Sequence, residues 1–335
     1  MEEKNKSKIY DIGIVPETTE LTERLILPYS ELNYCLNGLL FDRITLLIAP
    51  TNAGKSTLSS SFIKSAINQG YNVFGFFGED GGAEARDRIF RQHLEFDKVN
   101  FEYTKYYTKD GEKTNSGEYI LKHEKFEEVN QFYKGHLFIY NNNLLATKDS
   151  LIGAMEDARR NHDCRFFLID NAEMFELEGD NENKSMKEFC IALRQYAISQ
   201  KVHILLVCHI KKTERNICRP EIFDAKGTSS LTNIAKNIIS LIRTDTLNPN
   251  TKEYKSLKQV VEMNGYKIEE CDAIVEILKT KGRRNGMVGL KFNRISNSYY
   301  EATKYIETDE DDKPVIYAKE TKFTELDVSE EELPF

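Results

Sequence analysis

The sequence predicts an α/β protein with a central, mostly parallel sheet, a short N-terminal arm and an acidic C-terminal tail. Three observations support this prediction. From Arg43 onward, short apolar runs alternate with amphipathic stretches, as in successive βαβ units. A turn containing glycine directly follows the first of these runs. Both ends of the chain are polar and show little hydrophobic periodicity.

The predicted elements follow one another along the chain in a regular order. Strands are expected at Ile44–Ile48, Val73–Phe77, Leu137–Tyr140, Phe166–Ile169, His203–Val207, Ile238–Ile242, Ala273–Leu278 and Val288–Phe292. Helices are expected at Ser56–Asn68, Ala83–Leu94, Lys125–Tyr133, Ser150–Asn161 and Ser185–Ser199. Because helices separate the strands, we expect the strands to be mostly parallel, with helices on both faces of the sheet.

Three domain segments follow from this order: an arm at residues 1–30, a catalytic domain at 31–303 and a disordered tail at 304–335. Two stretches interrupt the alternation. Thr108–Gly117 is polar and is expected to form a loop. Thr246–Cys271 is charged and is expected to be an exposed, partly helical insertion.

Composition excludes several classes of protein. Hydrophobic residues make up 40% and charged residues 30%, which is ordinary for a globular protein with a sizeable core. No apolar run reaches the roughly 18 residues of a membrane span, and the N-terminus resembles neither a secretory signal nor a transit peptide. We therefore expect a cytoplasmic protein with no membrane partner, in the bacterial host cytoplasm if a phage encodes it.

The cysteines and the charge distribution add two expectations. The six cysteines are scattered without a close pair, so we expect reduced thiols, with Cys190 and Cys208 in the core and no structural zinc. Asp309–Phe335 holds ten acidic and three basic residues, a net charge of −7, which leaves −1 of the total −8 for the rest. A nearly neutral body can bind nucleic acid through a few well-placed cations.

The segment LLIAPTNAGKSTL carries the strongest local signal. It fits the phosphate-binding pattern G-x-x-x-x-G-K-[ST], with Ala49 in place of the first glycine. A strand lies before it and a helix after it, so backbone N–H groups and the helix N-terminus can face phosphates. Lys55 is expected to contact the phosphates and Ser56 to bind Mg²⁺. The nucleotide-binding residues are Pro50, Thr51, Asn52, Ala53, Gly54, Lys55, Ser56 and Thr57. No guanine-reading motif is evident, which favours ATP.

Three polar residues end later strands, where open α/β sheets bind their ligands. Glu79, after NVFGFFG, can polarise the water that attacks the γ-phosphate, and the adjacent Asp80 is easily confused with it. Asp170 follows RFFLI and can hold Mg²⁺. His209 ends HILLVC and can sense the γ-phosphate. An ordinary solvated acid and a structural histidine are the alternative interpretations of Glu79 and His209.

A basic loop follows His209. It reads KKTERNICRPEIFDAKGTSS, and its expected DNA contacts are Lys211, Lys212, Arg215, Lys226 and Gly227, with Arg219 nearby. Phosphate-backbone binding and a solvated surface loop are both compatible with this composition.

Several segments, taken in order, resemble the DnaB-like, RecA-type hexameric helicases, especially the helicase halves of phage primase-helicases and of mitochondrial Twinkle. They are APTNAGKST, FFGED, FFLIDNAEMF, LLVCHIKK, FDAKGTSSLTNIAKNIISLIR and KTKGRRNGMVGLKFN, between about Leu32 and Tyr300. The resemblance implies a RecA-like P-loop NTPase core that hydrolyses ATP with Mg²⁺. It also implies a homo-oligomeric ring of six subunits on single-stranded DNA.

The same resemblance assigns residues to a neighbouring subunit's site. A lysine-x-arginine pair of the family falls here on Lys281 and Arg283, with Gly286 closing the turn. Arg284 is an alternative arginine, and a plain basic β-turn is the alternative interpretation. An arginine supplied in trans stabilises charge on the transferring phosphoryl group. The family's primase, zinc-binding and helical collar segments have no counterpart in the sequence, so primer synthesis is not predicted.

The acidic tail ends in EEELPF, like the tips of bacterial single-strand-binding proteins. It is expected either to recruit a replication partner or to act only as a solubilising tail. The favoured function is therefore an ATP-dependent helicase of DNA replication. The alternatives are a RecA-like DNA-dependent ATPase without unwinding activity, such as a recombinase or helicase loader, a small-molecule kinase, and a nucleotide-switched binding module.

Overall fold

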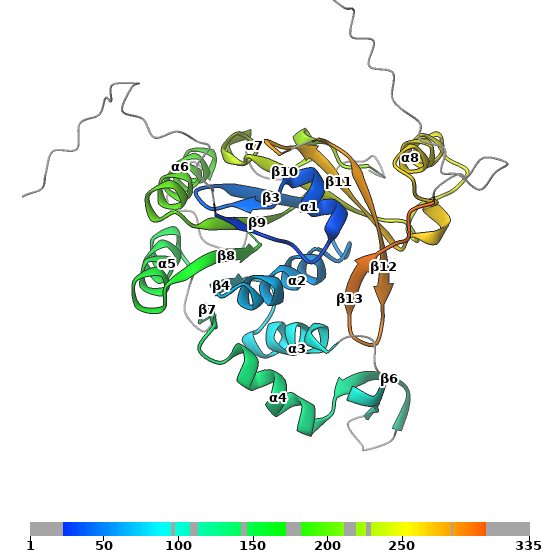
Figure 1. Cartoon of the computed structure of the whole chain (residues 1–335), viewed down its shortest axis with the longest axis horizontal. Helices are drawn as coiled ribbons and strands as arrows, with labels where there is room; N and C mark the ends of the chain where they lie inside the picture. Colours follow the sequence, from blue (N-terminus) through cyan, green and yellow to red (C-terminus); the bar gives the residue numbers. More distant parts are fainter. Residues whose placement is uncertain are drawn as a thin grey trace, which may run out of the picture.

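The computed structural model describes residues 23–94, 98–107, 113–141, 146–171, 182–210, 219–225, 229–282 and 284–305. Within these residues the main feature is a nine-stranded sheet (Figure 1). Its order is β13 (Ser298–Glu301), β12 (Met287–Asn293), β11 (Ala273–Lys279), β10 (Asn237–Arg243), β3 (Ile44–Ala49), β9 (His203–His209), β8 (Cys164–Asp170), β4 (Asn72–Phe77) and β7 (Leu137–Ile139).

Strands β10 to β7 of this order are parallel, and β11, β12 and β13 extend the sheet as an antiparallel meander. All carboxyl ends of the parallel strands therefore lie at one edge of the sheet. Strand β11 begins beside the end of β10 and runs back from that edge to the opposite one. This topology decides which candidate residues can meet.

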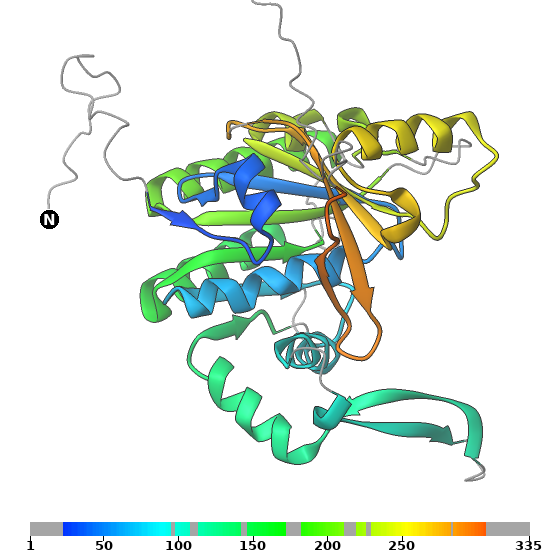
Figure 2. The ribbon, with the colours of Figure 1, turned by 45° about the vertical axis from the view of Figure 1, so that its right-hand side comes forward.

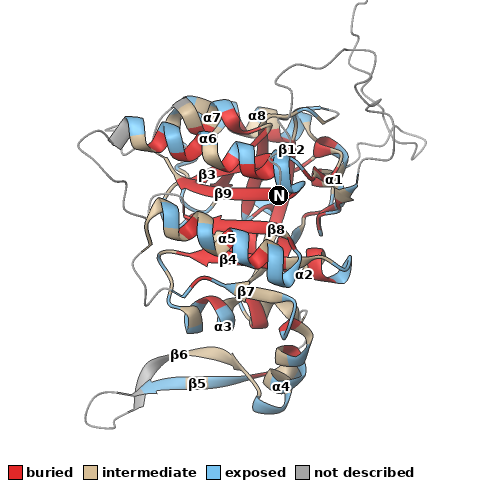
Figure 3. Cartoon of the chain, turned by 90° about the vertical axis from the view of Figure 1, so that its left-hand side faces the viewer, coloured by how far each residue is buried: buried red, intermediate tan, exposed pale blue. Residues whose placement is uncertain are grey.

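Helices cover both faces of the sheet (Figures 1 and 3). One face packs against α1 (Ser30–Leu36), α2 (Lys55–Asn68), α3 (Gly82–His93) and α4 (His123–Tyr133). The other packs against α5 (Lys148–His162), α6 (Glu182–Gln200) and α7 (Ser229–Ile234). Side chains alternate along β3, so Leu47 contributes to the first core and Leu46 to the second. Each fully buried leucine contributes about 1.5 to 3 kcal/mol, which fixes the strand that carries the P-loop.

The predicted strands and helices are confirmed, with boundaries that differ by a few residues. The segment expected as an arm contributes its described part to the core. Leu25, Leu27 and Tyr29 are buried, and β1 (Arg24–Leu25) pairs with β2 (Leu39–Leu40). Cys190 and Cys208 are buried in the second core, as predicted.

The expected loop was wrong, and the expected insertion is partly helical, as predicted, but not wholly exposed. Part of the expected loop Thr108–Gly117 belongs to a β-hairpin, because β5 (Phe101–Tyr107) pairs with β6 (Lys113–Leu121). The insertion Thr246–Cys271 is not simply exposed. Its helix α8 (Lys252–Met263) buries Leu257 and Val261 in a small third core beside β11 and β12. Residues spaced four apart on one helix face account for this burial.

Candidate nucleotide-binding site

The P-loop connects β3 to α2 at the carboxyl edge of the sheet. Gly54 has φ of +88° and precedes the first turn of α2, a conformation that glycine adopts without strain. A Cβ at this position would collide with the hydroxyl of Tyr299. The loop therefore brings its backbone to the N-terminus of a fourteen-residue helix, where unpaired N–H groups and the helix dipole favour an anion.

Lys55 is buried inside this loop, with 6% of its surface exposed. Its ammonium donates to the carbonyl oxygen of Pro50 at 3.0 Å and lies 3.0 Å from Nδ1 of His209. A buried ammonium needs such partners, because burial without them is costly. The Lys55 side chain therefore folds back on the loop, and its ammonium lies close to the backbone of the phosphate-binding segment.

Glu79, Asn171 and His209 form one hydrogen-bonded group at the ends of three adjacent strands. Nε2 of His209 lies 2.6 Å from Oε1 of Glu79, and the side-chain amide of Asn171 donates to the same oxygen. Because Lys55 can only donate, Nδ1 of His209 accepts and its Nε2 carries the proton. Lys55, His209 and Glu79 are therefore linked in series from the P-loop to the carboxylate.

The environment of Glu79 keeps its carboxylate ionised. Burial acts to raise the pKa of Glu79, but the hydrogen bond from His209, the charge of Lys55 and the bond from Asn171 together lower it below its ordinary value. About half of the Glu79 side chain is exposed (51%), so water can reach it. This combination suits a group that orients water and accepts its proton.

Asp170 and Ser56 form the second part of the site. Asp170 is buried at the end of β8, and the Ser56 hydroxyl hydrogen-bonds its carboxylate. Burial raises the pKa of Asp170, while this bond and the charges of Arg88 and Lys55 oppose the rise. A serine hydroxyl beside a carboxylate is an oxygen pair that Mg²⁺ accepts, so these residues fit a Mg²⁺–nucleotide complex.

Asp80 has a different role from Glu79. Its carboxylate forms an ion pair with Arg88 of α3, whose guanidinium also lies over the ring of Phe77 and donates to Ser60. Asp80 is thus held against α3, and Glu79 is the acid that joins the histidine.

Two further residues, neither of them predicted from the sequence, contact the P-loop backbone. Arg243, at the end of β10, donates to the carbonyl oxygen of Asn52 at 3.2 Å. Tyr299 of β13 donates to that of Ala53 at 3.4 Å, and burial raises its pKa to about 12. Both hold the loop from the antiparallel side of the sheet. A strand-ending arginine was visible in the sequence, but its contact with Asn52 was not.

Lys281 lies far from this cluster. It follows β11, whose last residue Lys279 pairs with Ile238, and Ile238 pairs with Leu46 near the start of β3. The backbone N–H of Lys281 faces Oδ1 of Asn237 at 3.4 Å. The turn after β11 is therefore at the edge opposite to the P-loop, about 15 Å away along β3 at 3.3 Å per residue.

Arg284, the alternative arginine of this turn, is bound within its own chain. Its guanidinium lies 2.8 Å from Glu31 and over the ring of Tyr34. Gly282 packs so closely on the end of α1 that a Cβ would collide with the carbonyl oxygens of Cys35 and Leu36. Arg283 lies outside the described residues.

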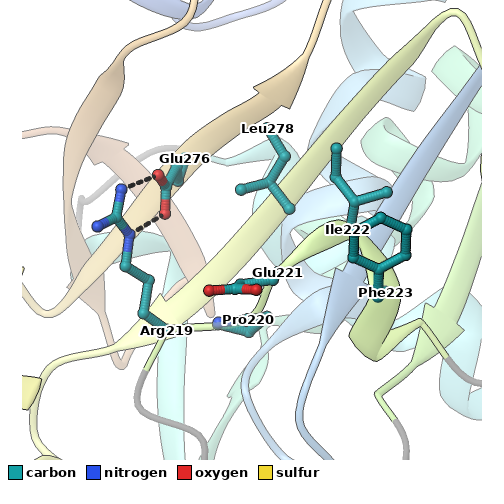
Figure 4. A pocket seen from close by; sticks show the side chains of 7 residues that line it. All are labelled: Arg219, Pro220, Glu221, Ile222, Phe223, Glu276 and Leu278. Atoms are coloured by element: carbon teal, nitrogen blue, oxygen red, sulfur yellow. Dashed lines mark hydrogen bonds and ion pairs between the residues drawn. The ribbon is translucent and has the colours of Figure 1, made fainter.

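The five expected DNA contacts, Lys211, Lys212, Arg215, Lys226 and Gly227, also lie outside the described residues. Residues 219–225 of the same loop are described, and Figure 4 shows Arg219 to Phe223. Arg219 binds Glu276 of β11 through two hydrogen bonds of 2.9 and 2.5 Å. It borders a hollow of about 330 Å³ with Phe223, whose surface is 80% exposed. Arg219 therefore anchors the loop to the sheet.

Comparison with known proteins agrees with this geometry. Residues 16–215 match the family model described as an AAA domain, a range that includes the P-loop, Glu79, Asp170 and His209. The chain belongs to the AAA domain family. No curated protein matches the sequence. Outside this AAA domain match lie β10 to β13, which supply Arg243 and Tyr299.

Two solved structures share the fold of this AAA domain protein. The first, described as an ATPase domain, superimposes with a TM-score of 0.62 and 15% identity, over 83% of this chain and 91% of that one. The second, a DnaB-like replicative helicase described with its interactions with primase, superimposes with a TM-score of 0.61 and 15% sequence identity. That superposition covers 83% of this chain and 63% of the helicase chain. These matches confirm the predicted RecA-like fold. No helix among the described residues has the length and apolarity needed to cross a bilayer.

Proposed function

We propose that this protein is an ATP-dependent DNA helicase of DNA replication that assembles as a six-membered ring and translocates on single-stranded DNA. The placement of Lys281 carries the proposal. Lys281 follows β11 at the edge of the sheet opposite to the P-loop, and this distance from its own nucleotide site supports a role at another subunit's nucleotide, together with Arg283. Subunits that each complete the neighbour's site form head-to-tail rings.

Within each site, the chain's own residues divide the chemistry. The backbone N–H groups of residues 51–57 bind the phosphates of ATP, and Lys55 neutralises part of their charge. Ser56 and Asp170 hold Mg²⁺, which offsets charge on the phosphates when bound. Glu79 orients the attacking water and accepts its proton, and Asn171 fixes the carboxylate for this step.

His209 connects this chemistry to DNA. It bonds Glu79 and Lys55 and is followed two residues later by the basic loop with Lys211, Lys212 and Arg215. A change at the γ-phosphate that moves His209 therefore moves the start of this loop. Lys226 and Gly227 complete the proposed contact with the phosphate backbone, and the EEELPF tail is proposed to bind a replication partner.

ATP hydrolysis and strand separation, measured on the same preparation, test this proposal. We expect single-stranded DNA to stimulate ATP hydrolysis and the protein to open a forked duplex, and we expect Glu79→Gln to abolish both while ATP still binds. DNA-stimulated hydrolysis without unwinding of the fork supports the alternative, a RecA-like DNA-dependent ATPase. Hydrolysis by a monomer that ignores DNA excludes both.

A further inference from the structure

The hairpin of β5 and β6 stands apart from the main sheet. Figure 2 shows it projecting from the body next to α4, and it pairs with none of the other described strands. Its base is held by the buried ring of Phe101, by Leu121 against the first core and by an ion pair from Arg91 to Glu118 at 3.3 Å. A two-stranded hairpin has little stability of its own in water, so these anchors fix a segment that is otherwise open to a partner.

The pairing register separates the described side chains of the hairpin by chemistry. Tyr103 lies opposite Tyr119 and Lys105 opposite Gly117, and residues two apart along a strand share a face. We call this set, Tyr103, Lys105, Gly117 and Tyr119, the tyrosine face. The other face carries Glu102, Thr104, Glu118 and Ile120. Both acidic residues of the described hairpin are thus on one side, and the aromatic pair with its lysine is on the other.

The tyrosine face has the chemistry of a base-stacking surface. The side chain of Tyr103 is half exposed (50%), and its ring meets that of Tyr119 edge-on at 5.3 Å. Lys105 is exposed two residues further along, about 7 Å from Tyr103 at the rise of a strand. Gly117 leaves no side chain opposite Lys105, and a Cβ there would collide with the backbone of Thr104. Aromatic rings beside a cation bind unpaired bases without sequence preference.

We propose that the tyrosine face binds single-stranded nucleic acid, with bases stacked on Tyr103 and Tyr119 and a phosphate paired with Lys105. This inference rests on the proposed function, which supplies a single strand. It adds a second contact, because the hairpin lies at the opposite end of the molecule from α7 in Figures 1 and 3, while Lys226 and Gly227 come within three residues of the start of α7 in the sequence. The other face carries Glu102 and Glu118, whose charges repel a phosphate backbone, and its ring, Tyr106, is bonded to Glu118.

Tyr106 offers a matched control for the experiment. It lies on the same strand with nearly the same exposure, 47%, and its hydroxyl bonds Glu118 on the acidic side. Binding of a labelled oligothymidylate to the full-length protein is measured by fluorescence anisotropy with an ATP analogue present. We expect Tyr103→Ala to raise Kd at least about fivefold, with Tyr103→Phe and Tyr106→Ala close to the parent. Lys105→Ala is expected to reduce the slope of log K against log salt by about 0.7.

The outcomes separate this inference from the proposed function. If the parent protein binds the oligonucleotide and Tyr103→Ala binds it as tightly as Tyr106→Ala does, the hairpin contact is wrong and the helicase proposal stands. If Tyr103→Ala instead changes the elution volume in size exclusion, the face is an interface between copies, which overturns the inference. A parent protein that neither binds the oligonucleotide nor is stimulated by it overturns both.

Discussion

Replacing Asn171 by leucine tests how the proposed catalytic carboxylate, Glu79, is held. Asn171 is 1% exposed, and its amide donates to Glu79 beside His209. Leucine keeps much of the volume but removes the donor. A hydrogen bond to a charged group contributes about 1.5 to 3 kcal/mol, and tenfold in rate corresponds to about 1.4 kcal/mol. We therefore expect kcat for ATP hydrolysis to fall between about 10- and 150-fold, with little change in nucleotide affinity.

The pH dependence of the same variant gives an independent readout. The Asn171 bond is one of the causes that lower the pKa of Glu79, so its removal raises that pKa. The acid limb of the kcat profile should then move to higher pH. A double-mutant cycle completes the assay, because Asn171→Leu should have no further effect on Glu79→Gln. A kcat within twofold of the parent, or an equal loss in both backgrounds, would refute the positioning role.

Two further predictions concern the P-loop and acid stability. Gly54→Ala and Gly135→Ala introduce the same strain, since both glycines have positive φ, but only the first adds a Cβ that meets Tyr299. We expect added ATP to raise the Tm of the Gly135→Ala variant but not that of the Gly54→Ala variant. Buried His203 has its pKa lowered from 6.5 to about 4, so only the unfolded chain takes up its proton between these values. Stability should fall as pH drops from 6.5 to 4, by up to about 3 kcal/mol. Over that pH range, the free energy of unfolding in urea should fall less for His203→Gln than for the parent protein. An equal fall in both contradicts this assignment.

The sequence predicted the P-loop and its three partner residues for a topological reason. Glu79, Asp170 and His209 each end a parallel strand, and the carboxyl ends of parallel strands share one edge. No knowledge of side-chain contacts was needed to bring them together. The RecA-like core followed from the same alternation of strands and helices.

Residues that act through distant contacts could not be predicted in this way. Asn171 follows Asp170 directly, and only its burial against Glu79 distinguishes it from any polar strand end. Arg219 was assigned to a DNA-facing loop, but it pairs with Glu276, which lies 57 positions further along the chain. Tyr299 contacts the P-loop from β13, which three strands separate from β3 in the sheet. Periodicity carries no information about such pairs.

The hairpin was missed although the sequence contained a signal for it. FEYTKYY is rich in aromatic and β-branched residues, and the expected loop includes Asp110-Gly111, a pair typical of tight hairpin turns. The polar composition of Thr108–Gly117 instead favours a loop. A strand that is solvated on one or both faces lacks the apolar run that marked the strands of the main sheet.

Mixing two inactive variants tests the shared catalytic site most directly. Glu79→Gln lacks the carboxylate in its own pocket, and Arg283→Ala lacks the proposed cation for its neighbour. If each pocket combines Glu79 of one subunit with Arg283 of the next, one interface in four of a random equimolar mixture is intact, so hydrolysis should recover to about a quarter of the parent rate. A mixture as inactive as its two components would contradict the account.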